Sequence, residues 1–89
     1  MIIELKKFGN TLISRQAGRE AFAAFQPTLR LVGPTEKLEI DFEGVLTFSP
    51  SWADEFLTPL VKEYGDRVAL NASDNPSVKA TLEILKQNR

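Results

Sequence analysis

The residues with the clearest chemical potential in this chain are two serines on either side of a proline, Ser49-Pro50-Ser51. Serine followed by proline is typical of a helix start, because the serine caps free backbone amides and proline fits the first helical position. Ser51 then falls in the first turn, where free amides and the helix dipole favour an anion. The spacing therefore predicts that Ser49 caps the helix. It also places Ser51 where the helix would tolerate a phosphate on its hydroxyl.

A second candidate is a group of carboxylates. Asp41 and Glu43 lie at the end of an expected strand, and Asp54 and Glu55 lie in the first turns of the next helix. Ligand sites of α/β proteins occur at such strand ends, and Mg²⁺ would accept these carboxylates. A simpler interpretation is a solvated strand face and two acids that complement the helix dipole. We favour the simpler interpretation and expect no metal and no cofactor.

The composition limits the chemistry further. The chain contains no cysteine and no histidine. Thiol nucleophiles, disulfides and ordinary structural zinc sites are therefore excluded, and so is imidazole, the usual general base near neutral pH. We expect a protein that is not an enzyme. Its net charge is −1 and its densest basic cluster is Lys6-Lys7, which argues against nucleic-acid binding because that requires a concentrated positive face.

Length and hydropathy predict one domain spanning residues 1–89. A chain of 89 residues with 43% hydrophobic and 26% charged residues supports one core and modest stability, so burial of a face against another chain is plausible. No apolar run approaches the roughly 20 residues that span a bilayer. Lysines follow the apolar start, which is the wrong order for a signal peptide. We expect a cytoplasmic protein that does not enter the membrane.

The elements that must position these residues alternate in type. The first half of the chain predicts a strand over 2–8 with Ile3 and Leu5 inward, and then a helix from the Ser14 cap to about Phe25. Pro27 should end that helix, since the residue before proline is disfavoured in helical conformation. A short strand over 29–32 is a weaker expectation.

The centre of the chain carries the clearest periodicities. Apolar and acidic residues alternate over 38–43, which predicts a strand, and the apolar run over 45–48 follows it. Residues 50–64 place their apolar side chains on one helical face. Trp52 lies on that face, as either a core residue or an interface anchor.

A short strand over 68–71, suited to the middle of a covered sheet, precedes the last helix. Asn75 caps that helix and Pro76 begins it, with Val78, Leu82 and Leu85 inward and Ile84 off the apolar stripe. The order β-α-β-α-β-α predicts an α/β domain with a mainly parallel sheet of three to four strands packed with helices.

Four segments of the chain form a recognisable pattern: Ile40-Asp41-Phe42-Glu43-Gly44-Val45, Phe48-Ser49-Pro50-Ser51-Trp52-Ala53-Asp54-Glu55-Phe56, Asn75-Pro76-Ser77-Val78-Lys79-Ala80-Thr81-Leu82, and Leu12-Ile13-Ser14-Arg15 before Gly18. Through these segments, over nearly its whole length, the chain resembles the STAS-like domains of unknown function of bacteria and archaea. The resemblance implies a STAS-like fold and a relation to anti-sigma factor antagonists.

In those antagonists, an Asp-Ser-Ser-Gly segment opens the helix, and a partner kinase phosphorylates the second serine, which breaks the complex. Only Ser51 matches that segment here. The resemblance therefore implies a non-catalytic regulatory module that binds a histidine-kinase-like ATPase or a similar regulator, with Ser51 as candidate phosphate acceptor. The candidate interaction surface is Phe48, Ser49, Pro50, Ser51, Trp52 and Arg15, the last of which could contact a carboxylate or phosphate.

Two alternatives stay open. The domain could be a small-molecule binder or weak enzyme. Some domains of the STAS group, which this chain resembles, are thought to bind nucleotides or lipids, although no Gly-rich phosphate loop of the usual spacing is present here. The domain could instead be a structural module that forms a homodimer through a sheet edge or helix face. Ligand binding in dilute solution would favour the first alternative, and a concentration-dependent mass the second.

Overall fold

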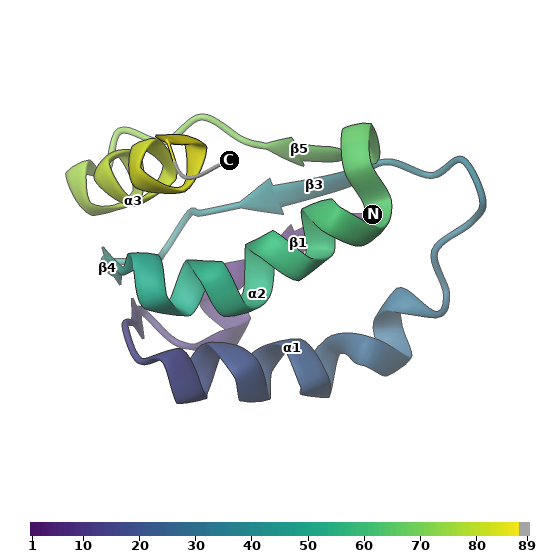
Figure 1. Ribbon diagram of the computed structural model, residues 1–89, viewed down its shortest axis with the longest axis horizontal. Helices are drawn as coiled ribbons and strands as arrows, with labels where there is room; N and C mark the ends of the chain where they lie inside the picture. Colours follow the sequence, from purple (N-terminus) through teal and green to yellow (C-terminus); the bar gives the residue numbers. More distant parts are fainter. Residues whose placement is uncertain (88–89) are drawn as a thin grey trace.

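A computed structural model describes residues 1–87 of the chain. The described residues form one small α/β domain in which strands and helices alternate (Figure 1). Its elements are β1 (Ile2–Glu4), the 3-10 helix η1 (Leu5–Phe8), β2 (Thr11–Leu12), α1 (Arg15–Leu29), β3 (Leu38–Asp41), β4 (Thr47–Phe48), α2 (Pro50–Tyr64), the 3-10 turn η2 (Gly65–Arg67), β5 (Val68–Leu70) and α3 (Pro76–Gln87).

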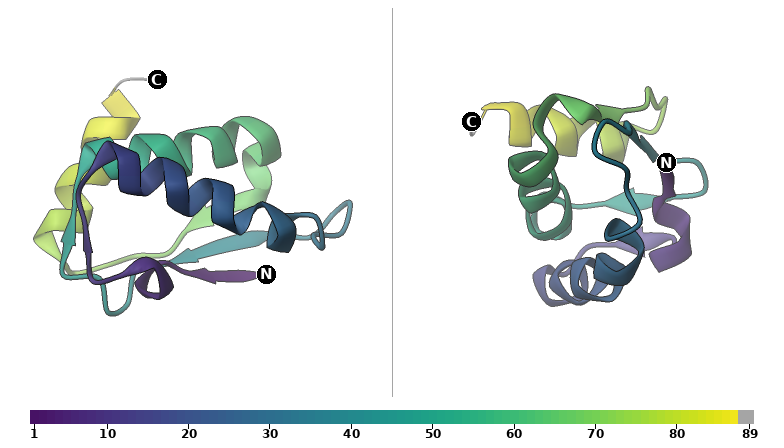
Figure 2. Two further views of the ribbon diagram at one scale, coloured as in Figure 1. Left: turned by 90° about the horizontal axis from the view of Figure 1, so that it is seen from below. Right: turned by 90° about the vertical axis from the view of Figure 1, so that its right-hand side faces the viewer.

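All strand pairing is parallel, as the alternation of strands and helices predicts. The main sheet has the order β1-β3-β5, with Ile3 opposite Ile40 and Ile40 opposite Leu70. A separate pair joins β2 to β4, with Leu12 opposite Phe48. The left view of Figure 2 shows α1 and α2 side by side over one face of the strands, with α3 at one end. Ile2 on the opposite face is 62% exposed.

The core lies between the main sheet and α2. The helix has the predicted bounds, and Trp52, Phe56 and Leu60 on its inner face are buried to 1% exposure or less. Leu38 and Ile40 of β3 face them and are fully buried, whereas the intervening Glu39 is exposed. The alternating pattern of β3 therefore has the predicted consequence, one apolar and one solvated face.

Three predictions about the first half of the chain were wrong. The strand expected over 2–8 is shorter, because η1 follows Glu4 and turns both Leu5 and Phe8 toward the core. Helix α1 does not end at Pro27 but continues to Leu29, which is 4% exposed. Burial of Leu29 offsets the one backbone hydrogen bond that proline cannot donate. The short strand expected over 29–32 is therefore absent, and Arg30 caps the helix.

The position of β5 also differs from the prediction. The strand pairs with β3 alone among the described residues, so it lies at the edge of the sheet rather than in its middle. Ala69 and Leu70 are exposed accordingly. An apolar run of this length fits a covered strand as well as an edge strand, so sequence periodicity could not separate the two.

Helix α3 is attached to the domain by hydrogen bonds at its start and at its middle, and by Leu82 and Leu85, which pack against the core. The Asn75 carboxamide accepts hydrogen bonds from Ser77 N at 2.8 Å and Val78 N at 3.3 Å, and donates to Val45 O at 2.9 Å. Thr81 Oγ1 donates to Phe48 O at 2.6 Å. The predicted Asn75 cap therefore also connects α3 to the segment before β4, and Thr81 connects it to β4 itself. Across residues 1–87, the helices are too short or too polar for any of them to span a bilayer.

Candidate interaction site at the start of helix α2

The start of α2 has the geometry that Ser49-Pro50-Ser51 predicts. Ser49 is extended, with φ −105° and ψ 155°, and its Oγ accepts a hydrogen bond from Trp52 N at 3.2 Å. The same hydroxyl donates to Ile13 O at 2.6 Å. Ser49 is therefore a structural residue, which caps α2 and holds the segment before α1 against it.

Ser51 differs from every other serine of the chain. The hydroxyls of Ser14, Ser49, Ser73 and Ser77 each bond to a backbone group. The Ser51 hydroxyl has no hydrogen-bond partner among residues 1–87, and the side chain is partly exposed in the first turn of α2. It is the serine hydroxyl left available for an external group.

A surface cavity of about 350 Å³ lies beside Ser51. It combines polar groups at the start of α1 and on α2 with apolar groups on α3. Its lining residues are Arg15, Pro50, Ser51, Asp54, Thr58, Ile84 and Leu85. Sequence reasoning identified Ser51, Pro50 and Arg15, and the position of Ile84 off the apolar stripe hinted at a contact surface. It did not place Ile84 beside Ser51, because nothing in the local pattern brings the α3 side chains next to α2.

The polar side of the cavity is an ion-pair network between α1 and α2. Arg15 Nη1 lies 3.0 Å from Asp54 Oδ2 and 3.5 Å from Glu55 Oε1, and Arg19 Nη2 lies 3.2 Å from Glu55 Oε1. Thr58 Oγ1 donates to Asp54 Oδ1 at 2.9 Å. The hydrogen bond from the Arg15 guanidinium, followed by that from the Thr58 hydroxyl, lowers the pKa of Asp54.

Replacing Asp54 by asparagine tests this network. Folding lowers the pKa of Asp54 below its ordinary value of 3.8. The carboxylate therefore stabilises the folded state at pH values above 3.8, and this stabilisation is lost as the pH falls through the lowered pKa of the folded protein. The wild-type protein is expected to be slightly more stable than Asp54→Asn at neutral pH, with the difference closing in acid. Urea unfolding across that pH range measures it. A difference that stays constant or widens in acid would contradict the assignment.

Two members of the predicted interaction surface are not on the surface. Phe48 is 2% exposed and Trp52 is 1% exposed. Their rings lie 5.8 Å apart, and the Trp52 ring stacks on Phe56 at 5.0 Å. The interface-anchor interpretation of Trp52 was wrong, because the first turn of α2 directs this ring into the aromatic core. Both residues are part of the core beneath the surface of the site.

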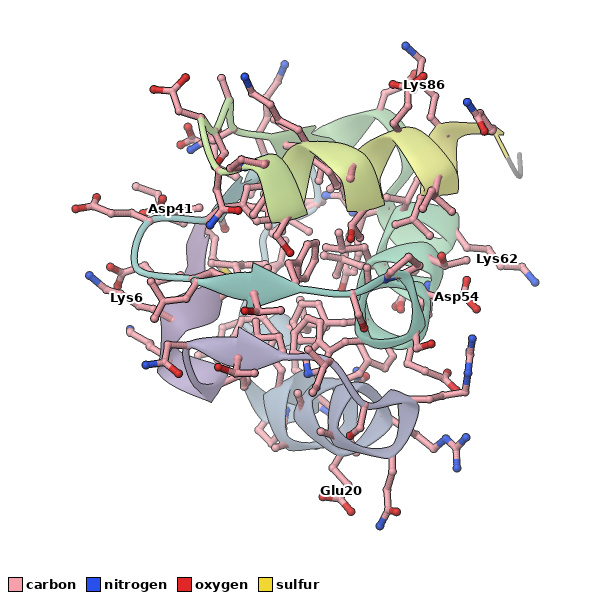
Figure 3. All side chains as sticks on the ribbon, turned by 90° about the vertical axis from the view of Figure 1, so that its left-hand side faces the viewer. Lys6, Glu20, Asp41, Asp54, Lys62 and Lys86 are labelled. Atoms are coloured by element: carbon pink, nitrogen blue, oxygen red, sulfur yellow. The ribbon has the colours of Figure 1, made fainter. Side chains whose placement is uncertain are left out.

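The four carboxylates considered as a metal site, Asp41, Glu43, Asp54 and Glu55, do not form one cluster. Figure 3 shows Asp41 and Asp54 on opposite sides of this end of the molecule. The Asp41 carboxylate accepts a hydrogen bond from Glu43 N at 3.0 Å, whereas Asp54 pairs with Arg15. Residues 1–87 contain no group of three or more acidic side chains arranged to hold a metal ion.

Comparison with known protein families identifies the family of this chain. The family model described as a STAS-like domain of unknown function matches residues 25–75, more than half of the chain. The chain belongs to this family. No curated protein and no solved structure matched this STAS-like domain.

The matched part of this STAS-like domain contains only part of the site. It runs from the last turns of α1 to the Asn75 cap, so it includes β3, β4, α2 and β5. Ser51, Asp54 and Thr58 fall inside it, whereas Arg15 and Ile84 fall outside. The resemblance of the segments Leu12–Arg15 and Pro76–Leu82 is therefore not covered by the family model.

Proposed function

We propose that this STAS-like domain is a non-catalytic regulatory module of the cytoplasm, which binds a protein partner through the surface around Ser51. The proposal rests on one observation above all. Within residues 1–87, Ser51 is the serine whose hydroxyl has no hydrogen-bond partner, and it lies beside a cavity with both charged and apolar walls. In this proposal, transfer of a phosphoryl group from ATP to Ser51 Oγ releases ADP and a proton, and ends the partner complex.

Exposed apolar residues near Ser51 support a protein partner. Ile13 is 50% exposed and Ile84 is 42% exposed. The Ile13 carbonyl bonds to Ser49, and Ile84 lines the cavity beside Ser51. Figure 1 shows the starts of α1 and α2 at the same end of the molecule as α3. Apolar groups bordered by charged ones are typical of protein interfaces.

The charges at this site would make phosphorylation an effective switch. A phosphoserine adds about −1.5 to −2 charges. The Arg15 guanidinium already pairs with Asp54, so a phosphate on Ser51 would compete with that carboxylate for the arginine. A partner that fits the unmodified surface would then meet added bulk and negative charge, although the helix start itself tolerates an anion.

The resemblance to anti-sigma factor antagonists supports the partner class. Their partners are histidine-kinase-like ATPases, which both bind the domain and phosphorylate it. We infer a partner of this class, or a regulator under similar control, because Ser51 occupies the position of the phosphorylated serine in the antagonist segment.

Affinity capture from host lysate with and without magnesium-ATP tests the proposal. The wild-type bait is expected to retain an ATP-binding protein without ATP, and to lose it and gain one phosphate at Ser51 with ATP. Ser51→Ala should retain the partner under both conditions, and Ser51→Asp should bind it weakly under both. Intact mass and peptide mapping locate the phosphate.

Ser73→Ala is the matched control, because Ser73 lies in the β5–α3 connection, away from the Ser51 cavity. It should behave as wild type in both lysates. A phosphate on another residue, or capture that is the same for wild type, Ser51→Asp and the control, would refute the switch. Absence of both partner and phosphate would refute the proposed function as a whole.

A further inference from the structure

A second and larger cavity shares Leu85 with the lining of the cavity beside Ser51, and we propose that it binds a small anionic amphiphile, a molecule with an apolar chain and a carboxylate-like head. The cavity measures about 540 Å³ and lies between α2, α3 and the segment that follows β5. Its volume is within the range of small-molecule sites. This inference does not depend on the proposed partner interface, although Leu85 lines both cavities.

The walls of this cavity are largely aliphatic. Side chains of α2, the end of β5 and the inner face of α3 contribute, namely Leu57, Val61, Leu70, Val78, Leu82 and Leu85. Leu57 and Val78 are buried in the core, whereas Leu70 is 41% exposed. The cavity opens beside β5, which is a short edge strand, and beside the second half of α3, because the α3 side-chain hydrogen bonds to Phe48 O come from Ser77 and Thr81 in its first half. An aliphatic chain would cover leucine surface that water now contacts.

Charged side chains of α3 border this apolar space. Lys79, Glu83 and Lys86 line it, and neither lysine has an ion-pair partner among residues 1–87. Their spacing of three to seven residues places them on one side of α3, with the lysines about 10 Å apart along its axis. Figure 3 shows Lys86 projecting outward from the upper helix. Two ammonium groups against one carboxylate favour an anionic head.

The same charges argue against a second copy of this chain as the occupant. An isologous dimer through this cavity would place the same patch of both copies, each with two lysines and one glutamate, in one interface, and this excess of like charge opposes association. A nucleotide is also a poorer match, because the lining contains no glycine and hence no close backbone approach for phosphates. An aliphatic anion matches both the apolar side chains that line the cavity and the lysines at its edge.

Decanoate and decanol, used below their aggregation concentrations, are the probes. Titration of the ¹⁵N-labelled protein with decanoate is expected to shift the amide resonances of Val61, Leu70 and Leu82 in a saturable way, and to leave that of Arg15 in place. Lys79→Met and Lys86→Met should each weaken decanoate about two- to fivefold, as expected for an exposed ion pair. Neither variant should weaken decanol.

Lys37→Met is the matched control, since Lys37 lies in the α1–β3 connection and does not line the cavity. It should bind decanoate as wild type. Equal loss in Lys37→Met, tighter binding of decanol than decanoate, or shifts outside the cavity would overturn the proposal. So would shifts of the same amides that grow with protein concentration alone, because they would assign the cavity to self-association.

Discussion

Replacing Trp52 by alanine is expected to lower the free energy of unfolding by about 3–5 kcal/mol. The indole is 1% exposed and contacts three aromatic rings, with centroid distances of 5.0 Å to Phe56, 5.8 Å to Phe48 and 6.0 Å to Phe8. Alanine would leave a large cavity at the centre of this cluster. A domain of this size is stable by roughly 5–10 kcal/mol, so the variant should lose a large fraction of its stability.

Urea denaturation followed by circular dichroism measures the loss. Ile84→Ala is the matched control, because it also removes a large apolar side chain from a helix, but one that is 42% exposed. It is expected to change stability by less than about 1 kcal/mol, while weakening the partner binding proposed above. A Trp52→Ala protein that keeps wild-type stability would show that the ring is not part of the core.

Gly18→Ala is expected to destabilise the domain by about 1–3 kcal/mol, although alanine favours a helix by about 1 kcal/mol over glycine. A Cβ atom at Gly18 would lie 2.6 Å from Trp52 O and 3.0 Å from Trp52 Cα. These are backbone atoms, which cannot rotate away. Helices α1 and α2 would have to separate, which would disturb the Ser49 cap and the Arg15–Asp54 pair at the same end.

Gly33→Ala separates this steric effect from the general effect of removing a glycine. A Cβ atom at Gly33 has no neighbour closer than 3.8 Å. The control variant should therefore remain within about 0.5 kcal/mol of wild type. Urea midpoints of the two variants compare them directly. If Gly18→Ala proved as stable as wild type, the contact between the two helix backbones would not be a constraint on this fold.

The parts of the fold predicted from the sequence are those that local physics determines. Helix α2 begins at Pro50 because Ser49 caps it, and its apolar face continues in phase to Tyr64. Strand β3 shows strict alternation, and Asn75 and Pro76 define the start of α3. Each of these features depends on neighbouring residues in the chain.

The wrong predictions depend on contacts between distant residues. Pro27 is unfavourable in a helix by itself, but burial of Leu29 keeps α1 helical through it. Whether β5 lies in the middle or at the edge of the sheet depends on which strands pair, which its own residues do not encode. For the same reason, the sequence identified Ser51 and Arg15 but not Ile84 as part of one cavity.

The parallel pairing of the strands constrains how the chain can fold. Parallel strands cannot be joined by a tight hairpin. Strand β1 therefore pairs with β3, and β2 with β4, across more than thirty intervening residues. Closing such loops costs entropy before any ladder forms, which makes folding slower than in proteins with local contacts. During synthesis, β1 and β2 therefore leave the ribosome early and stay unpaired until their partners follow, while α1, whose backbone hydrogen bonds are local, is able to form first.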